Sequence, residues 1–228
     1  MRDDLTAPPI NPLPWVVWAI ALPMIAMELV LSAGESGLVG GPTAIGWRVD
    51  ALQRFAVAPE LVRWMFANGV WPLDGLLRFV TYPFVQGSVT QAVFVVVMLL
   101  ALGKMVGEVF RWWAVLAVFL QSSIVAALGF SALPFIEAPL FGGYPGVYGL
   151  IGAFTWLLWT RLRGTGAAQY RAFSFIAFLM GVQLLFGLIF GAAPWWIAEL
   201  MGFATGFLLS FAVSPGGLST LRARLRNR

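Results

Sequence analysis

Residues 142–153 read GGYPGVYGLIGA, and an apolar run continues from them to residue 162. Glycine and proline crowd the beginning of this segment. Such helix-breaking residues are tolerated at membrane depth only where protein or a water-filled cavity covers the backbone. We therefore predict that residues 146–162 form a central helix that begins partway into a bilayer.

A second stretch with small residues, AELMGFATG at residues 198–206, suits close packing against that helix. Gly202 and Gly206 are four residues apart and so lie on one face of a helix. Small residues at this spacing let two membrane helices approach closely. We predict that Gly202 and Gly206 meet Gly149 and Gly152 in a seam between two helices, with Gly146 also at a packing position.

The composition around these stretches is that of a membrane protein. Hydrophobic residues make up 60% of the 228-residue chain and charged residues only 11%, whereas a soluble domain carries about a quarter charged residues. The apolar segments long enough to span a bilayer, or nearly so, are residues 15–32, 84–102, 112–130, 146–162, 173–190 and 195–213. The predicted fold class is an all-α membrane protein with six transmembrane helices.

The segments outside these spans define the predicted domain organisation. Residues 15–213 form the membrane domain, between a cytoplasmic N-terminal segment (1–14) and a basic cytoplasmic tail (214–228). The longest connection, residues 33–83, contains two amphipathic stretches at 47–56 and 59–68, which predict short helices at the membrane interface.

Lysine and arginine are unevenly divided by the six predicted spans. Of the 14 such residues, ten fall on the side of the two termini and four on the other, namely Arg48, Arg54, Arg63 and Arg78. Because cytoplasmic loops carry the excess of these residues, we predict that both termini are cytoplasmic, in a bacterial-type inner (plasma) membrane.

The chain contains no cysteine and no histidine. Disulfides, thiolate metal sites and a cysteine nucleophile are therefore excluded, and any proton transfer must occur without the side chain best suited to it near neutral pH. The net charge of +4 is scattered rather than gathered into a basic face. We expect membrane lipid as a partner, and no nucleic acid, metal or cofactor.

Three segments in order resemble the rhomboid family of intramembrane serine proteases. They are residues 78–106 (RFVTYPFVQGSVTQAVFVVVMLLALGKMV), 142–153 and 198–206. The resemblance implies a six-helix bundle with a large, partly helical first external loop and a lateral opening that admits transmembrane segments. The first segment and the residues just after it keep the family outline at Arg78, Thr81, Phe84, Ser88, Gly103 and Glu108.

The residues that carry rhomboid chemistry are replaced in this resemblance. The family's serine nucleophile aligns with Pro145 and its histidine base with Glu199. Two further histidines of the family align with Gln86 and Gln91, and an asparagine aligns with Val95. In the family, the second of these histidines and the asparagine help to hold the oxyanion. Proline has neither a hydroxyl group nor an N–H, so nucleophile and one backbone donor disappear together. We predict no active catalytic residue, and thus an inactive homologue.

The function that this resemblance favours is non-proteolytic binding or regulation of transmembrane client proteins. Gln86, Gln91, Tyr144 and Glu199 would line its polar centre, with gate residues from the second and fifth helices and the first loop. A carboxylate inside a membrane helix is costly and needs a partner or a function. For Glu199 the choices are a structural tie to Tyr144, Gln86 or Gln91, and contact with a client.

Two other functions are open from the sequence. The first is the intramembrane serine-type endopeptidase that homology alone suggests, here with Tyr144 as nucleophile and Glu199 as base; tyrosine is a poor nucleophile because its pKa is about 10. The second is a small transporter that uses Glu199 and Glu28 as a relay. Ser122 and Ser123 are expected to bond back to their own helix.

Overall fold

The computed structural model describes residues 12–162, 169–190 and 194–214. Its elements in chain order are α1 (Trp15–Glu35), η1 (Gly41–Gly46), α2 (Trp47–Phe55), α3 (Pro59–Asn68), α4 (Leu73–Thr81), η2 (Tyr82–Phe84), α5 (Val89–Gly107), α6 (Trp112–Ala132), α7 (Tyr144–Leu162), η3 (Gln169–Phe173), α8 (Ser174–Phe190) and α9 (Trp195–Val213). Among these residues, α1, α5, α6 and α9 are long and apolar enough to cross a membrane. The count of six spans, which adds the 19-residue α7 and the 17-residue α8, stays a prediction.

Most predicted helix bounds agree with the structure to within a few residues. α9 begins and ends where the sequence predicts, and α2 and α3 are the two helices predicted in the first loop. α5 begins five residues later than predicted, because Ser88 caps it by accepting a hydrogen bond from the Gln91 N–H. α4 was not predicted. Most of residues 1–14 and 214–228 lies outside the described residues.

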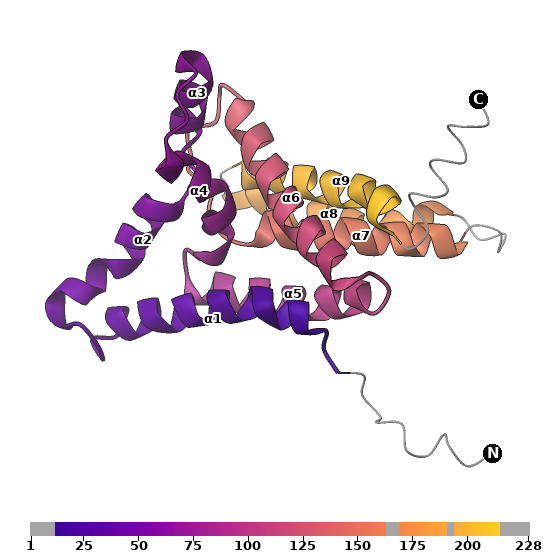
Figure 1. Cartoon of the computed structure of the whole chain (residues 1–228), viewed down its shortest axis with the longest axis horizontal. Coiled ribbons are helices and arrows are strands. Elements are labelled where there is room, and N and C mark those ends of the chain that lie inside the picture. The colour runs from indigo at the N-terminus through magenta and orange to yellow at the C-terminus, as the bar shows by residue number, and fades with distance from the viewer. Residues whose placement is uncertain (1–11, 163–168, 191–193, 215–228) are drawn as a thin grey trace, which may run out of the picture.

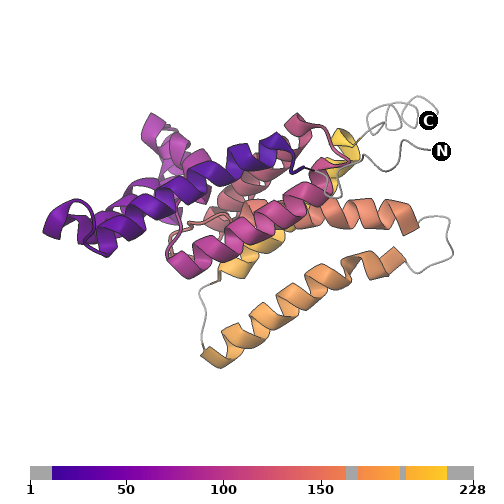
Figure 2. The ribbon, with the colours of Figure 1, turned by 90° about the horizontal axis from the view of Figure 1, so that it is seen from below.

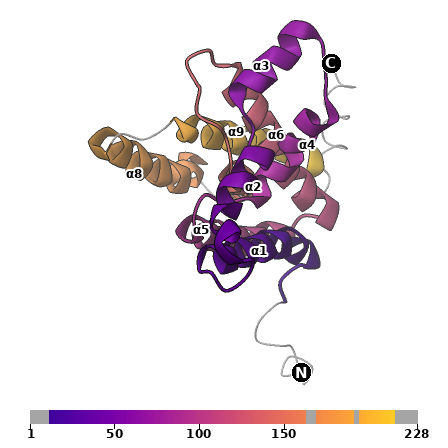
Figure 3. The ribbon, with the colours of Figure 1, turned by 90° about the vertical axis from the view of Figure 1, so that its left-hand side faces the viewer.

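The bundle is arranged around α7. This helix packs against α5, α6 and α9, while α1 covers α5 on the outside (Figure 1). Helices α2, α3 and α4 of the first loop gather at one end of the bundle, and α8 stands apart from the other long helices (Figures 2 and 3). The prediction that the fourth apolar segment is central is confirmed.

Glycines bring α7 and α9 into backbone contact. A Cβ added at Gly206 would overlap the backbone oxygen of Gly149, and one at Gly202 would overlap the oxygen of Pro145. From the other side, a Cβ at Gly152 would overlap the oxygen of Phe203. The two helices therefore pack at the closest separation that backbones allow, in the predicted seam.

The other two predicted packing glycines extend this contact to a third helix. A Cβ at Gly146 would meet the ring of Phe119, and one at Gly149 would meet Ser122, both on α6. Gly149 thus serves two neighbours, since its oxygen lies against α9 and its α-carbon faces α6. α7 is held between α6 and α9 by glycines on two of its faces.

Replacing Gly206 by alanine should therefore destabilise the bundle. The new methyl group meets a backbone oxygen that cannot move away without separating the helices, so we expect a loss of about 1–3 kcal/mol. Thermal unfolding in detergent micelles measures it. Gly181→Ala on α8 is the matched control, because a Cβ there meets nothing within 4 Å; equal melting temperatures for the two variants would contradict the seam.

A buried arginine joins the first loop to the membrane helices. Arg48 on α2 is 6% exposed; its Nη2 donates to Glu28 Oε1 (2.7 Å) and its Nε donates to Glu35 Oε1 (2.6 Å), both on α1. Its Nη1 donates to the backbone oxygen of Gln86 (3.0 Å). The hydrogen bonds to the two glutamates raise the pKa of Arg48, so this cluster keeps its charge.

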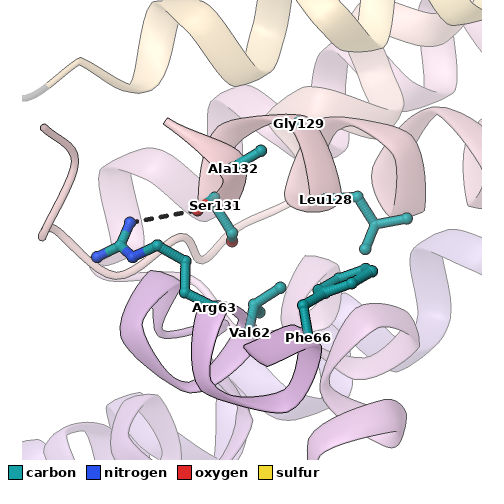
Figure 4. Close-up of a pocket in the computed structure, with 7 residues that line it drawn as sticks. All are labelled: Val62, Arg63, Phe66, Leu128, Gly129, Ser131 and Ala132. Atoms are coloured by element: carbon teal, nitrogen blue, oxygen red, sulfur yellow. Dashed lines mark hydrogen bonds between the residues drawn. The ribbon is translucent and has the colours of Figure 1, made fainter. Parts of the chain in front are cut away.

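Two other arginines of the loop bind backbone oxygens. Arg63 on α3 donates from Nη1 to the oxygens of Ser131 (3.2 Å), Leu133 (3.1 Å) and Ile136 (3.0 Å), where α6 ends. Figure 4 shows Arg63 reaching toward Ser131 beside a pocket of about 500 Å³ between α3 and α6. Arg78 donates to the oxygens of Gln53 and Ala56, which ties α4 to α2. The loop is thus held in place by its arginines.

Replacing Arg48 by methionine should unfold the loop or the whole bundle at a lower temperature. Glu28 would be left buried without its cation, and breaking a buried ion pair from one side costs about 2–5 kcal/mol. Arg54→Met is the control, because Arg54 lies on the same helix and is exposed. Equal melting temperatures of the two variants in micelles would contradict this structural role of the ion pair.

Candidate functional site

A cavity of about 170 Å³ lies where α5, α7 and α9 begin. One wall comes from the connection before α7, and α8 contributes one side chain. The lining residues are Gln91, Leu140, Phe141, Tyr144, Pro145, Gln183, Trp195 and Glu199. Of the predicted polar centre, the structure brings Gln91, Tyr144 and Glu199 together around this cavity.

The beginning of α7 is built by local backbone chemistry. Proline is accommodated in the first turn of a helix, where a backbone N–H has no partner within the helix, and Pro145 occupies this turn. Gly142 just before it has φ of +87°, which favours glycine. Leu140 pairs with Val57 through two backbone hydrogen bonds of 2.9 Å, so the first loop positions this wall of the cavity.

Glu199 is the buried carboxylate of the site. It is 5% exposed in the first turns of α9. It interacts with the side chains of Tyr148 on α7 and Gln183 on α8, and the Tyr148 hydroxyl donates to Gln183 Oε1 at 3.4 Å. Within the described part of the chain, Glu199 Oε2 is buried without any hydrogen-bond partner. Three helices therefore meet at this carboxylate, and one of its oxygens is unsatisfied.

Gln86 does not line the cavity, which corrects the prediction that it belongs to the polar centre. Its side chain is 1% exposed. Nε2 donates to the Pro83 oxygen (2.8 Å), and Oε1 accepts from the Gly143 N–H (3.3 Å). Both ends of the amide are engaged with backbone groups, so Gln86 braces the connection before α7 from behind.

The resemblance to rhomboids places the oxyanion-holding side chains at Gln91 and Val95, and these two residues have different surroundings. Gln91 faces the cavity, and its Oε1 accepts from the Gly87 N–H at 3.0 Å. Val95 is fully buried and packs with Met24 over Gly143. A hydrocarbon contact therefore stands where the resemblance to rhomboids places an asparagine.

Sequence reasoning missed two residues of the site, Tyr148 and Gln183. Tyr148 follows Tyr144 by one helical turn, and Gln183 is the one polar side chain in the middle of an apolar segment. Both signals were readable, because a polar residue inside a membrane helix is costly and faces the protein interior. Tyr148 and Gln183 interact with Glu199 in place of the predicted partners, which were Tyr144, Gln86 or Gln91.

The two serines of α6 behave differently. Ser123 Oγ donates to the Phe119 oxygen (2.9 Å), which confirms the predicted bond within its own helix. Ser122 was expected to do the same, but that prediction is wrong: its hydroxyl is buried under Gly149 with no partner among the residues that the structure describes. The close approach of α7 to α6 covers it.

These features define a class of protein: a multi-pass helical membrane protein whose glycine-packed central helix begins at a cavity lined by polar and apolar side chains. The family model of the Rhomboid domain matches residues 74–216. The chain therefore belongs to the rhomboid family, as the three sequence segments indicated, and is an integral membrane protein. A comparison with curated protein sequences finds no significant match.

We predict that Gln86 matters for stability more than Gln91 does. Gln86→Met would leave the Gly143 N–H and the Pro83 oxygen buried without partners, and each such loss costs about 1–3 kcal/mol. Gln91→Met is the matched control, since Gln91 is only half-buried. Thermal melts of the two variants in micelles compare them; a larger loss for Gln91→Met would show that Gln86 is not the brace.

Proposed function

We propose that this rhomboid-family protein binds transmembrane segments of other membrane proteins without cleaving them. The observation that carries the proposal is the pairing of Pro145 and Glu199 in one cavity. These residues align with the family's serine and histidine. At position 145 no hydroxyl is present to attack a peptide bond. At position 199 a carboxylate interacts with side chains of α7 and α8.

The remaining groups of the cavity support the same proposal. An oxyanion needs several donors aimed at one point, and Gln91 is the amide left on α5, because Val95 is apolar and packed.

Tyr144 has a hydroxyl group and lines the cavity with Glu199. These two residues are the basis of the alternative, an intramembrane endopeptidase of the same family with Tyr144 as nucleophile and Glu199 as base.

Access from the membrane is supported by the position of α8. This helix stands apart from the bundle (Figure 2), yet its Gln183 lines the same cavity as Gln91 of α5. A client helix that enters between α5 and α8 would therefore reach the polar residues directly.

We further propose six spans, cytoplasmic termini and a bacterial-type plasma membrane, from the distribution of lysine and arginine.

The transporter alternative has less support. A relay requires acidic groups that can exchange protons along a path. Glu28 instead binds Arg48 and Ser32 at the first loop, and it is not among the residues that line the Glu199 cavity.

The test uses purified protein in liposomes with a panel of rhomboid-type transmembrane reporters. We expect no cleaved fragment and co-isolation of some reporters with the protein, since binding does not need the missing groups. The Glu199→Ala variant runs beside it, to separate its own activity from a contaminating protease. A fragment that appears with the natural chain and disappears with Glu199→Ala would establish the endopeptidase and overturn the proposal.

A further inference from the structure

We infer that the cavity at Glu199 receives a primary amine, namely a lysine side chain carried in the membrane part of a client helix. This inference rests on the proposed function and names the class of client that the site selects. It predicts that the protein prefers transmembrane segments with a single lysine over uniformly apolar ones.

The unsatisfied carboxylate oxygen is the first observation. Glu199 is 5% exposed, and its Oε2 has no partner within the described residues. An isolated carboxylate away from water is strongly unfavourable unless something hydrogen-bonds to it. Glu199 lines the cavity, although Oε2 itself is buried. We infer that a donor in the cavity reaches this oxygen once the carboxylate turns toward it.

The described part of the chain places no cation at this cavity. No lysine or arginine is among the residues that line the cavity. Of the four arginines at this end of the described chain, Arg48 binds carboxylates of α1, and Arg63 and Arg78 bind backbone oxygens. The fourth, Arg54, is exposed and lies over the ring of Phe55. Because the described residues offer no cation here, we infer that a positive charge for Glu199 comes from a second molecule.

The arrangement of acceptors suits an ammonium group better than a guanidinium group. An ammonium offers three donors from a compact centre. Glu199 Oε2, the Gln183 amide oxygen and the Tyr144 hydroxyl are acceptors on the cavity wall or next to it. The planar fork of arginine is matched best by both oxygens of a carboxylate, and within the described residues one oxygen of Glu199 lacks a partner.

The shape of the site agrees with this choice. A cavity of about 170 Å³ accepts the slim stem and head of one lysine side chain but not a whole helix. The stem is apolar and would lie against Leu140, Phe141 and Trp195 while its head reaches Glu199. The client backbone would stay in the lipid between α5 and α8.

The experiment measures binding of synthetic transmembrane peptides to the full-length protein in phosphatidylcholine liposomes, by energy transfer between labels. The host peptide is a leucine–alanine helix with lysine, methionine or asparagine at its central position. We expect the lysine peptide to bind about tenfold more tightly than the methionine peptide, a factor in the range of polar contacts in membranes. Asparagine should fall near methionine, because it carries no charge.

Variants assign the preference to Glu199. Glu199→Gln should bind the lysine and methionine peptides alike, while Glu108→Gln, at the exposed far end of α5, should keep the preference. Glu199→Lys should prefer a peptide with central glutamate, which a misfolded variant cannot do. Thermal melts confirm that each variant is folded.

Two results would overturn the inference, in different ways. If the natural chain binds all three peptides equally, or if Glu199→Gln keeps the lysine preference, the amine site does not exist although the protein still binds transmembrane segments. If no peptide binds, the proposed function fails along with it.

Discussion

The structure depends on the direct backbone contact between α7 and α9. Lipid provides little hydrophobic drive for two helices to associate, so contact must come from close packing. Gly202 and Gly206 allow it, because their α-carbons lie against the backbone oxygens of Pro145 and Gly149. Pro145 is itself part of the contact, and Glu199 precedes Gly202 by less than one turn. The seam therefore determines how Pro145 and Glu199 are placed relative to each other at the cavity.

A second set of constraints comes from outside the membrane helices. Arg48 links α2 to two carboxylates of α1 and to the backbone of Gln86, and the amide of Gln86 in turn holds the N–H of Gly143. A continuous chain of charged and polar contacts therefore runs from the first loop to the beginning of α7. Such buried networks are costly when only partly satisfied, so the loop and the cavity wall are expected to be ordered together.

Much of the fold was predictable from local patterns, and the site was predictable only in part. The bounds of α9 and the glycine seam follow from apolar length and small-residue spacing, which are properties of single segments. The role of Gln86 was not predictable, because its partners Pro83 and Gly143 are determined by how two separate turns meet. Gln183 was visible in the sequence as a polar residue of α8, but its pairing with Glu199 was not, because that depends on where α8 lies in the bundle.

The chemistry of the cavity bears on what a rhomboid scaffold with Pro145 and Glu199 at one cavity could do. If the cavity served packing alone, an apolar residue at position 199 would avoid the cost of burying a carboxylate. The site instead pairs Glu199 with Tyr148 and Gln183 and leaves Oε2 buried without a partner among the described residues. Within the described residues this carboxylate is costly for stability and incompletely satisfied, and the proposed contact with a client side chain would supply the missing partner. Under that proposal, the seam between α7 and α9 holds Glu199 in place for recognition of a client.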